Sequence, residues 1–196
     1  MRRIGAVLAA ALFAWAVHLD AQPRRPASPE GTSATQVDGR WIEIVYGRPI
    51  LRGRTNIFGA GADYGKTLFD GGTVWRAGAN VSTRLRSEVP LAVGGKRVAP
   101  GEYVLLIDLK SERDWTLILT TQTYALKFDP QDKKDLYGGF NYRPEHDAAR
   151  VPMRVESLAY SVDQLTWWFT DVTPSGGTLR IAWEKTMASA PFTIVK

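Results

Sequence analysis

Short runs in which apolar and polar residues alternate follow one another along most of the chain, beginning near Trp41. Tyr103, Leu105, Ile107 and Leu109 share one face of the run 102–110, and Leu179, Ile181 and Trp183 share one face of the run 176–185. Successive side chains of a strand point to opposite faces, so this pattern predicts strands with one buried face. Further strands are expected at 41–46, 81–86, 89–93, 96–99, 115–119, 151–162, 164–172 and 187–195.

The residues between these runs are typical of tight turns. Gly94-Gly95 separates two short runs and predicts a β-hairpin. Pro100-Gly101 combines a fixed φ with a residue that tolerates positive φ, as in a type II turn. About nine or ten short strands without a long amphipathic helix predict an all-β fold, either a sandwich or a barrel. We favour an antiparallel β-sandwich.

One region, 124–150, departs from this pattern because it is long and polar. It contains Asp129-Pro130, Lys133-Lys134-Asp135 and Gly138-Gly139, which do not fit a regular strand. We therefore expect one long loop excursion from the sheet here. Long loops in compact domains are often functional, but the sequence leaves the role of this one open.

The first residues have the order of charged, apolar and small residues that defines a secretory signal. Arg2 and Arg3 precede an uncharged apolar run at 4–17. We predict a signal peptide at 1–21, cut after Ala21 or alternatively after Ala14-Trp15-Ala16, and hence export to the periplasm or the medium. The alternative is an uncleaved membrane anchor, although the run is shorter than the roughly 20 apolar residues of a spanning helix.

The mature chain is expected to have two parts. Residues 22–40 are rich in Pro, Ser, Thr, Gly and Gln, which predicts a flexible leader. Residues 41–196 then form a single domain. The chain has no cysteine, so disulfides, a thiolate nucleophile and a lipid anchor on cysteine are excluded, and the domain depends on its apolar core.

Charge and histidine content narrow the function classes further. The basic residues behind the net charge of +5 are spread along the chain, and an exported protein is separated from the nucleic acids of the cell. We therefore predict no nucleic-acid binding. An anionic ligand or envelope surface fits the charge better, and a neutral site is favoured over both. His146 is the only histidine after His18, and no Gly-x-Ser-x-Gly elbow exists. We predict no metal site and no cofactor.

Glycine, arginine and aromatic residues are densest between 47 and 80. Glycine lets a backbone approach a ligand closely, and arginine offers a planar fork of donors to an oxyanion. These residues predict a ligand pocket around Arg48, Trp75, Arg76 and Asn80.

The same stretch carries a resemblance to a known family. Tyr46-Gly47-Arg48-Pro49, Arg52-Gly53-Arg54 and the block 75–80 (Trp-Arg-Ala-Gly-Ala-Asn) resemble the DUF2911 family of bacterial exported proteins, and the resemblance covers roughly 27–195. That family has no assigned function, so the resemblance implies export and fold but no activity. Residues 124–139 look longer than usual for the family.

Each pocket residue also has a structural interpretation. Trp75 fits a core position, Asn80 a turn, and Arg48 a surface charge. Arg76 fits an ion pair with a buried acid such as Glu184, which would hold parts of the sheet together. The sequence does not decide between these roles and ligand contact.

We expect a protein that binds a small or carbohydrate-like ligand, and two alternatives stay open. One is a carboxylate-dependent hydrolase, which would use two of the acids Asp63, Asp70, Asp171 and Glu184. The other is a structural or assembly module of the cell envelope. Whether the protein is an enzyme, and its oligomeric state, are not fixed by the sequence.

Overall fold

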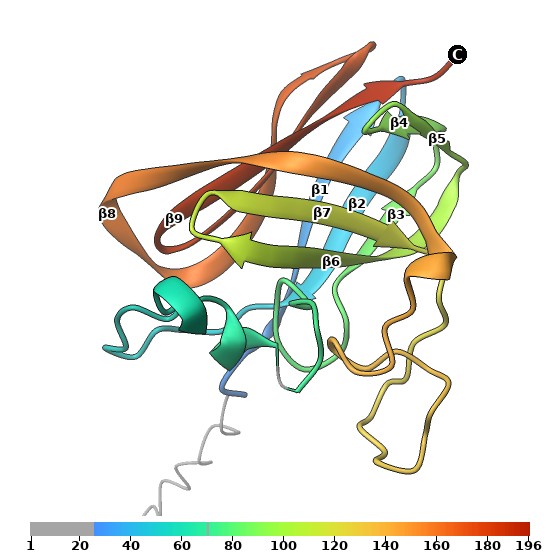
Figure 1. The fold of residues 1–196 in the computed structure, drawn as a ribbon. Coiled ribbons are helices and arrows are strands. Elements are labelled where there is room, and N and C mark those ends of the chain that lie inside the picture. Colours follow the sequence, from blue (N-terminus) through green and yellow to red (C-terminus); the bar gives the residue numbers. More distant parts are fainter. Residues whose placement is uncertain (1–25, 70) are drawn as a thin grey trace, which may run out of the picture.

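A computed structural model describes residues 26–69 and 71–196 (Figure 1). Its strands form one nine-stranded sheet in the order β1-β2-β3-β6-β7-β8-β9-β4-β5, with antiparallel neighbours. The strands are β1 (Glu30–Val37), β2 (Arg40–Gly47), β3 (Arg84–Ser87), β4 (Leu91–Val93), β5 (Lys96–Val98), β6 (Gly101–Ser111), β7 (Asp114–Thr120), β8 (Asp147–Thr173) and β9 (Gly176–Ile194). Three short 3-10 helices are η1 (Gly61–Asp63), η2 (Lys66–Leu68) and η3 (Pro144–His146).

The predicted all-β class and the antiparallel pairing are confirmed. The hydrogen bonds join the strands in a single sheet rather than in two separate ones. No helix within 26–69 and 71–196 is long and apolar enough to cross a membrane. The predicted signal peptide, 1–21, lies outside the described residues.

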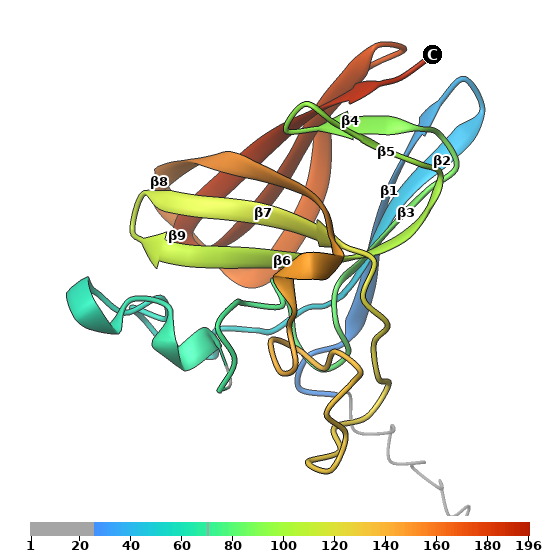
Figure 2. The same ribbon diagram turned by 45° about the vertical axis from the view of Figure 1, so that its right-hand side comes forward.

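The long strand β8 lets the sheet curl around its core. Its first part pairs with β7, and its later part pairs with β9, with register shifts between Ser157 and Thr166. Within this shifted stretch the strand meets the chain that follows β2, where the Leu51 N–H donates to the Asp163 carbonyl (2.7 Å). The curled sheet encloses its inner face, as the turned view shows (Figure 2).

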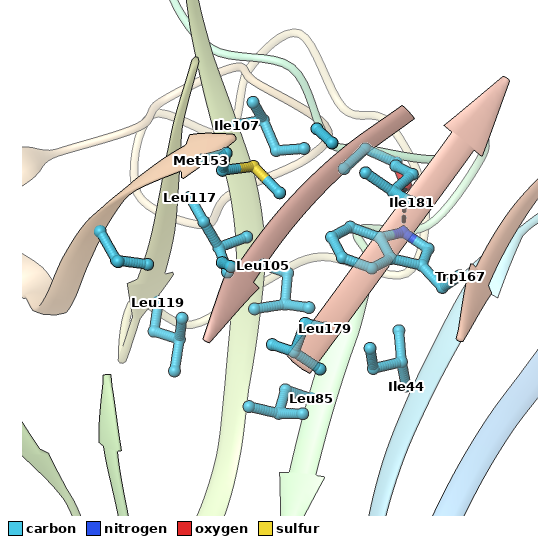
Figure 3. Close-up of a cluster of buried hydrophobic side chains, with 14 of the residues drawn as sticks. Ile44, Leu85, Leu105, Ile107, Leu117, Leu119, Met153, Trp167, Leu179 and Ile181 are labelled. Atoms are coloured by element: carbon cyan, nitrogen blue, oxygen red, sulfur yellow. Dashed lines mark hydrogen bonds between the residues drawn. The ribbon is translucent and has the colours of Figure 1, made fainter. Parts of the chain in front are cut away.

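The inner face carries the main hydrophobic core. Figure 3 shows Leu105, Leu117 and Leu179 gathered around Trp167, and all four are buried. Trp167 also satisfies its indole N–H, which donates to the Ala77 carbonyl (2.9 Å). Burial of each such side chain stabilises the fold by about 1.5–3 kcal/mol, so these alternating positions are what hold the curled sheet together.

The prediction of a flexible leader at 22–40 is wrong for Glu30–Val37, which form β1. This strand pairs with β2 along its whole length through a turn at Asp38-Gly39, where both residues have positive φ. Asp-Gly is a strong hairpin signal that composition alone hides. The strand is polar because it lies at the sheet edge, with most of its side chains exposed or half-buried.

The long excursion also proves to be packed. We call residues 121–146 the cap. Its Leu136 is fully buried against the outer face of the sheet in a second cluster with Val104, Leu106 and Ile118. The buried amide of Gln122 orders the cap from within, because its Nε2 donates to the Asn141 (2.7 Å) and Lys134 (3.2 Å) carbonyls.

Candidate functional site

A cleft of about 490 Å³ lies where several segments of the chain meet. Its walls come from Pro49 and Arg54, from η2, from 75–80 and from Trp183 of β9, and the cap contributes Tyr137. Figures 1 and 2 show 48–69 and the cap projecting from the same end of the sheet. The cleft is therefore built by the irregular parts of the chain on a rigid sheet.

Three of the predicted pocket residues, Trp75, Arg76 and Asn80, line this cleft, and each has a structural partner. Trp75 is only 2 % exposed and exchanges two backbone hydrogen bonds with Ile107 (2.8 Å each). Its ring lies parallel to that of Trp183 and edge-on to Phe58, with ring centroids 6.4 and 5.7 Å away. Trp75 thus forms part of the aromatic core that floors the cleft.

Arg76 is 8 % exposed and fastens the cap to the segment 75–80. Its Nη1 donates to the Asn80 carbonyl, and its Cζ lies 5.4 Å from the centre of the Tyr137 ring. Gly138 makes this approach possible, since a Cβ there would stand 2.7 Å from Cζ of Arg76. The guanidinium is therefore a fixed part of the cleft wall.

Asn80 closes the same wall with a residue in the left-handed region, at φ 62°. Its side-chain Nδ2 donates to the Ser28 carbonyl (3.0 Å), which ties the chain before β1 to the cleft. Asparagine adopts this conformation more readily than most residues, so the backbone explains its presence without a ligand.

Arg48 lies outside this cleft and clasps two strands instead. Its Nη2 donates to Thr166 Oγ1 (3.2 Å), and its backbone N–H donates to the Pro29 carbonyl (2.8 Å). A Cβ at Gly31 would stand 2.3 Å from Cδ of Arg48, so β1 passes directly over this side chain. Arg48 is therefore placed to hold β1 against β8.

The structure does not bring Glu184 and Arg76 together. The carboxylate of Glu184 accepts the backbone N–H groups of Asn56 (2.5 Å) and Ile57 (3.1 Å), and it borders a different cleft of about 580 Å³. Arg76 faces the cap, whereas Glu184 faces the segment that follows Arg54, because the register of β9 shifts at this residue. The expected ion pair between Arg76 and Glu184 is therefore not formed, and Glu184 instead holds the backbone at Asn56 and Ile57.

The acids expected of a hydrolase are also separated in the described residues. Asp63 pairs with Lys66 (2.9 Å) and Asp171 with Arg180 (3.7 Å), both on exposed surface, while Glu184 is the backbone clamp. Asp70 lies outside the described residues. In the described part of the chain, no group of three or more His, Asp and Glu residues could hold a metal ion.

Sequence reasoning missed most of the cleft lining, including the side chains of Arg54, Tyr137 and Trp183. Arg54 follows a tight turn in which Arg52 and Gly53 both have positive φ, and this turn brings its side chain over the Trp183 ring. The Arg-Gly-Arg pattern was a usable signal for Arg54. Tyr137 carried none, because only the folding of the cap places it here.

Burial also governs the titration of the floor beneath the cleft. Tyr64 accepts a hydrogen bond from Trp115 Nε1 (2.9 Å) inside the aromatic core. Burial disfavours the charged phenolate and raises the pKa of Tyr64 to about 12. Tyr64 therefore keeps its proton, and its hydrogen bond with Trp115, well above pH 10.

Comparison with known proteins gives one match. The family model described as "Protein of unknown function (DUF2911)" matches residues 28–192 and confirms the resemblance found in the sequence. The match begins before β1, in agreement with β1 being part of the domain. No curated protein and no solved structure matches the chain.

Proposed function

The chain belongs to the DUF2911 family, which assigns no function, and we propose that it is an exported protein that holds a small ligand in the 490 Å³ cleft. The observation that carries the proposal is the cleft itself. Its volume falls in the range of about 300–1,000 Å³ typical of small-molecule sites. Its lining joins aromatic rings to a few polar donors, which is the usual composition of such sites.

The firmness of the walls supports binding. The Arg76 contacts to Asn80 and Tyr137 fix one wall, and two carbonyl contacts of Arg54 fix the other. A ligand that enters a site of this kind has little chain to order, so less of its interaction energy is lost. A small polar ligand or a sugar of one or two rings fits this space.

Binding is favoured over hydrolysis because no aspartate or glutamate among the described residues lines the 490 Å³ cleft. A glycosidase needs two carboxyl groups on either side of the scissile bond. The described residues of the cleft contribute arginine, amide and hydroxyl donors to its lining instead. Donors of this kind recognise oxygen atoms without supplying a general acid and base.

A cleft-filling variant tests the proposal. Thr67 is exposed and lines the cleft, and its Oγ1 donates to the Ile57 carbonyl (3.1 Å), so Thr67→Trp should block the site at the cost of this one hydrogen bond. Thr32→Trp places the same ring on exposed β1 as a control. A panel of sugars and organic acids is screened for compounds that raise the melting temperature. We expect such compounds to stabilise the wild type and Thr32→Trp, and to leave the melting temperature of Thr67→Trp unchanged. A panel without any stabilising compound, or with equal stabilisation of both variants, would contradict the proposal.

Export is the second part of the proposal, and it is tested separately. The uncharged run 4–17 behind Arg2 and Arg3 supports it. Expression of the full chain in a bacterial host, followed by fractionation and intact-mass measurement, should give a periplasmic product that begins at Gln22. A cytoplasmic product that retains residues 1–21 would contradict export and leave the cleft proposal standing.

A further inference from the structure

We propose that the ligand of this cleft carries a single carboxylate on a sugar-sized ring, and that the carboxylate binds Arg54. The inference rests on the proposed function and adds a ligand class to it. Two features of the Arg54 side of the cleft support it: within 26–69 and 71–196, Arg54 has no ion pair, and the buried indole N–H of Trp183 has no acceptor.

Arg54 is held in place, yet its charge is not compensated. Its Nε donates to the Leu51 carbonyl and its Nη2 to the Ile50 carbonyl, both at 3.0 Å. Within residues 26–69 and 71–196, no carboxylate lies within ion-pair distance of Arg54. A guanidinium has five N–H donors, so the two on Nη1 and one on Nη2 still lack protein partners there.

These remaining donors have the geometry of a carboxylate site. The Nη1 and Nη2 ends of a guanidinium form a planar fork that binds two carboxylate oxygens side by side. Because the two backbone carbonyls already orient the side chain, less rotamer freedom is lost when an anion binds. Arg76 contributes less, since its Nη1 and its flat face are used by Asn80 and Tyr137.

Trp183 provides the independent second feature. Its ring lies beneath Arg54, with the Cζ of Arg54 5.9 Å from the ring centre, and it lines the same cleft. Its Nε1 is buried and has no hydrogen-bond partner in the described structure. Buried donors are nearly always paired, so this one indicates an acceptor that the protein chain does not supply. The nitrogen is covered by neighbouring atoms, so an acceptor reaches it only after a small local shift of the wall.

The charge count favours a carboxylate over a phosphate. A phosphate carries close to two negative charges at neutral pH, whereas Arg54 offers one uncompensated positive charge. The cleft volume and the apolar side chains of Pro49, Leu68 and Trp183 leave room for a ring beside the anion. A sugar acid or an alicyclic carboxylate has both parts.

Three probes with the same ring test this assignment: glucuronate, glucose and glucose 6-phosphate. Isothermal titration of the mature protein with each should show glucuronate bound at least tenfold more tightly than the other two. Arg54→Gln should remove this preference, and Trp183→Phe should weaken glucuronate binding several-fold. Arg97→Gln removes the same charge from exposed β5 and should change nothing.

The outcomes separate the ligand class from the cleft itself. If glucose binds as tightly as glucuronate and Arg54→Gln has no effect, the carboxylate inference is wrong, while binding in the cleft stands if Thr67→Trp abolishes it. Tightest binding of glucose 6-phosphate would replace the carboxylate by a phosphate and also overturn the inference. A concentration of 10 mM is roughly a hundredfold above the dissociation constant of an ordinary metabolite site. If none of the three probes binds at 10 mM, the inference is overturned for sugar-sized rings.

Discussion

Two arginines border the cleft, and they differ in what they do for the fold. Arg76 is buried, donates to the Asn80 carbonyl and stacks on Tyr137 of the cap. Arg54 is exposed and touches only nearby carbonyls and the Trp183 ring in the described structure. Both stand in the same glycine- and arginine-rich stretch of sequence. Their burial, rather than their residue type, separates a structural fastener from a group available to a ligand.

The largest effect is expected from Arg76→Ala. It leaves the Asn80 carbonyl without its donor and detaches Tyr137 of the cap, so the free energy of unfolding should fall by about 2–4 kcal/mol. Denaturant unfolding measures this, with Arg97→Ala on the exposed edge as the control. A loss below about 0.5 kcal/mol would make Arg76 an ordinary surface residue and end the contrast with Arg54.

The aromatic core that includes Trp75, Trp115 and Tyr64 should show an intermediate effect. Tyr64→Phe deprives the buried Trp115 N–H of its acceptor and should cost about 1–3 kcal/mol at pH 8. The change keeps the ring, so the loss reports the hydroxyl alone.

The pH dependence sharpens this prediction. The pKa of Tyr64 is about 12 in the folded protein and near 10 when unfolded, so its contribution is complete below pH 10. Between pH 10 and 12 the unfolded chain loses this proton first, and the contribution falls as pH rises. Unfolding free energies of wild type and Tyr64→Phe, measured from pH 8 to 11, should therefore converge. If the difference in unfolding free energy between wild type and Tyr64→Phe stays constant above pH 10, the assigned burial of Tyr64 is contradicted.

The smallest effect on stability is expected from Arg54→Gln. The side chain is exposed, and exposed arginine–aromatic contacts contribute about 0.5–1 kcal/mol. The unfolding free energy without ligand should therefore change by less than about 1 kcal/mol, measured beside Arg76→Ala in the same buffer. A loss as large as that of Arg76→Ala would mean that Arg54 is structural too.

Much of the fold was predictable, because it depends on local alternation. The runs at 102–110, 115–119 and 176–185 lie within β6, β7 and β9, because alternate apolar residues of each run face the main core. The edge strand β1 was missed, because an exposed strand needs no apolar face. The turn pair Asp38-Gly39 was the local sequence signal that pointed to a hairpin containing β1.

The site was predictable only in part. The sequence pointed to Trp75, Arg76 and Asn80, and the structure places all three in one cleft. It also grouped Arg48 with them, although Arg48 reaches β8 on another side. Neighbours in sequence need not share a site, because the direction of each side chain follows from the turn that carries it.

The sequence by itself determined the all-β class, the family and the segment in which the cleft lies, because these depend on local periodicity and on short motifs. The tertiary structure alone decided which arginine is buried, which acid meets which backbone N–H, and that Tyr137 of the cap closes the cleft. These features arise from contacts between residues far apart in the chain. Such contacts depend on how the sheet curls and where the cap packs, and no local pattern records either.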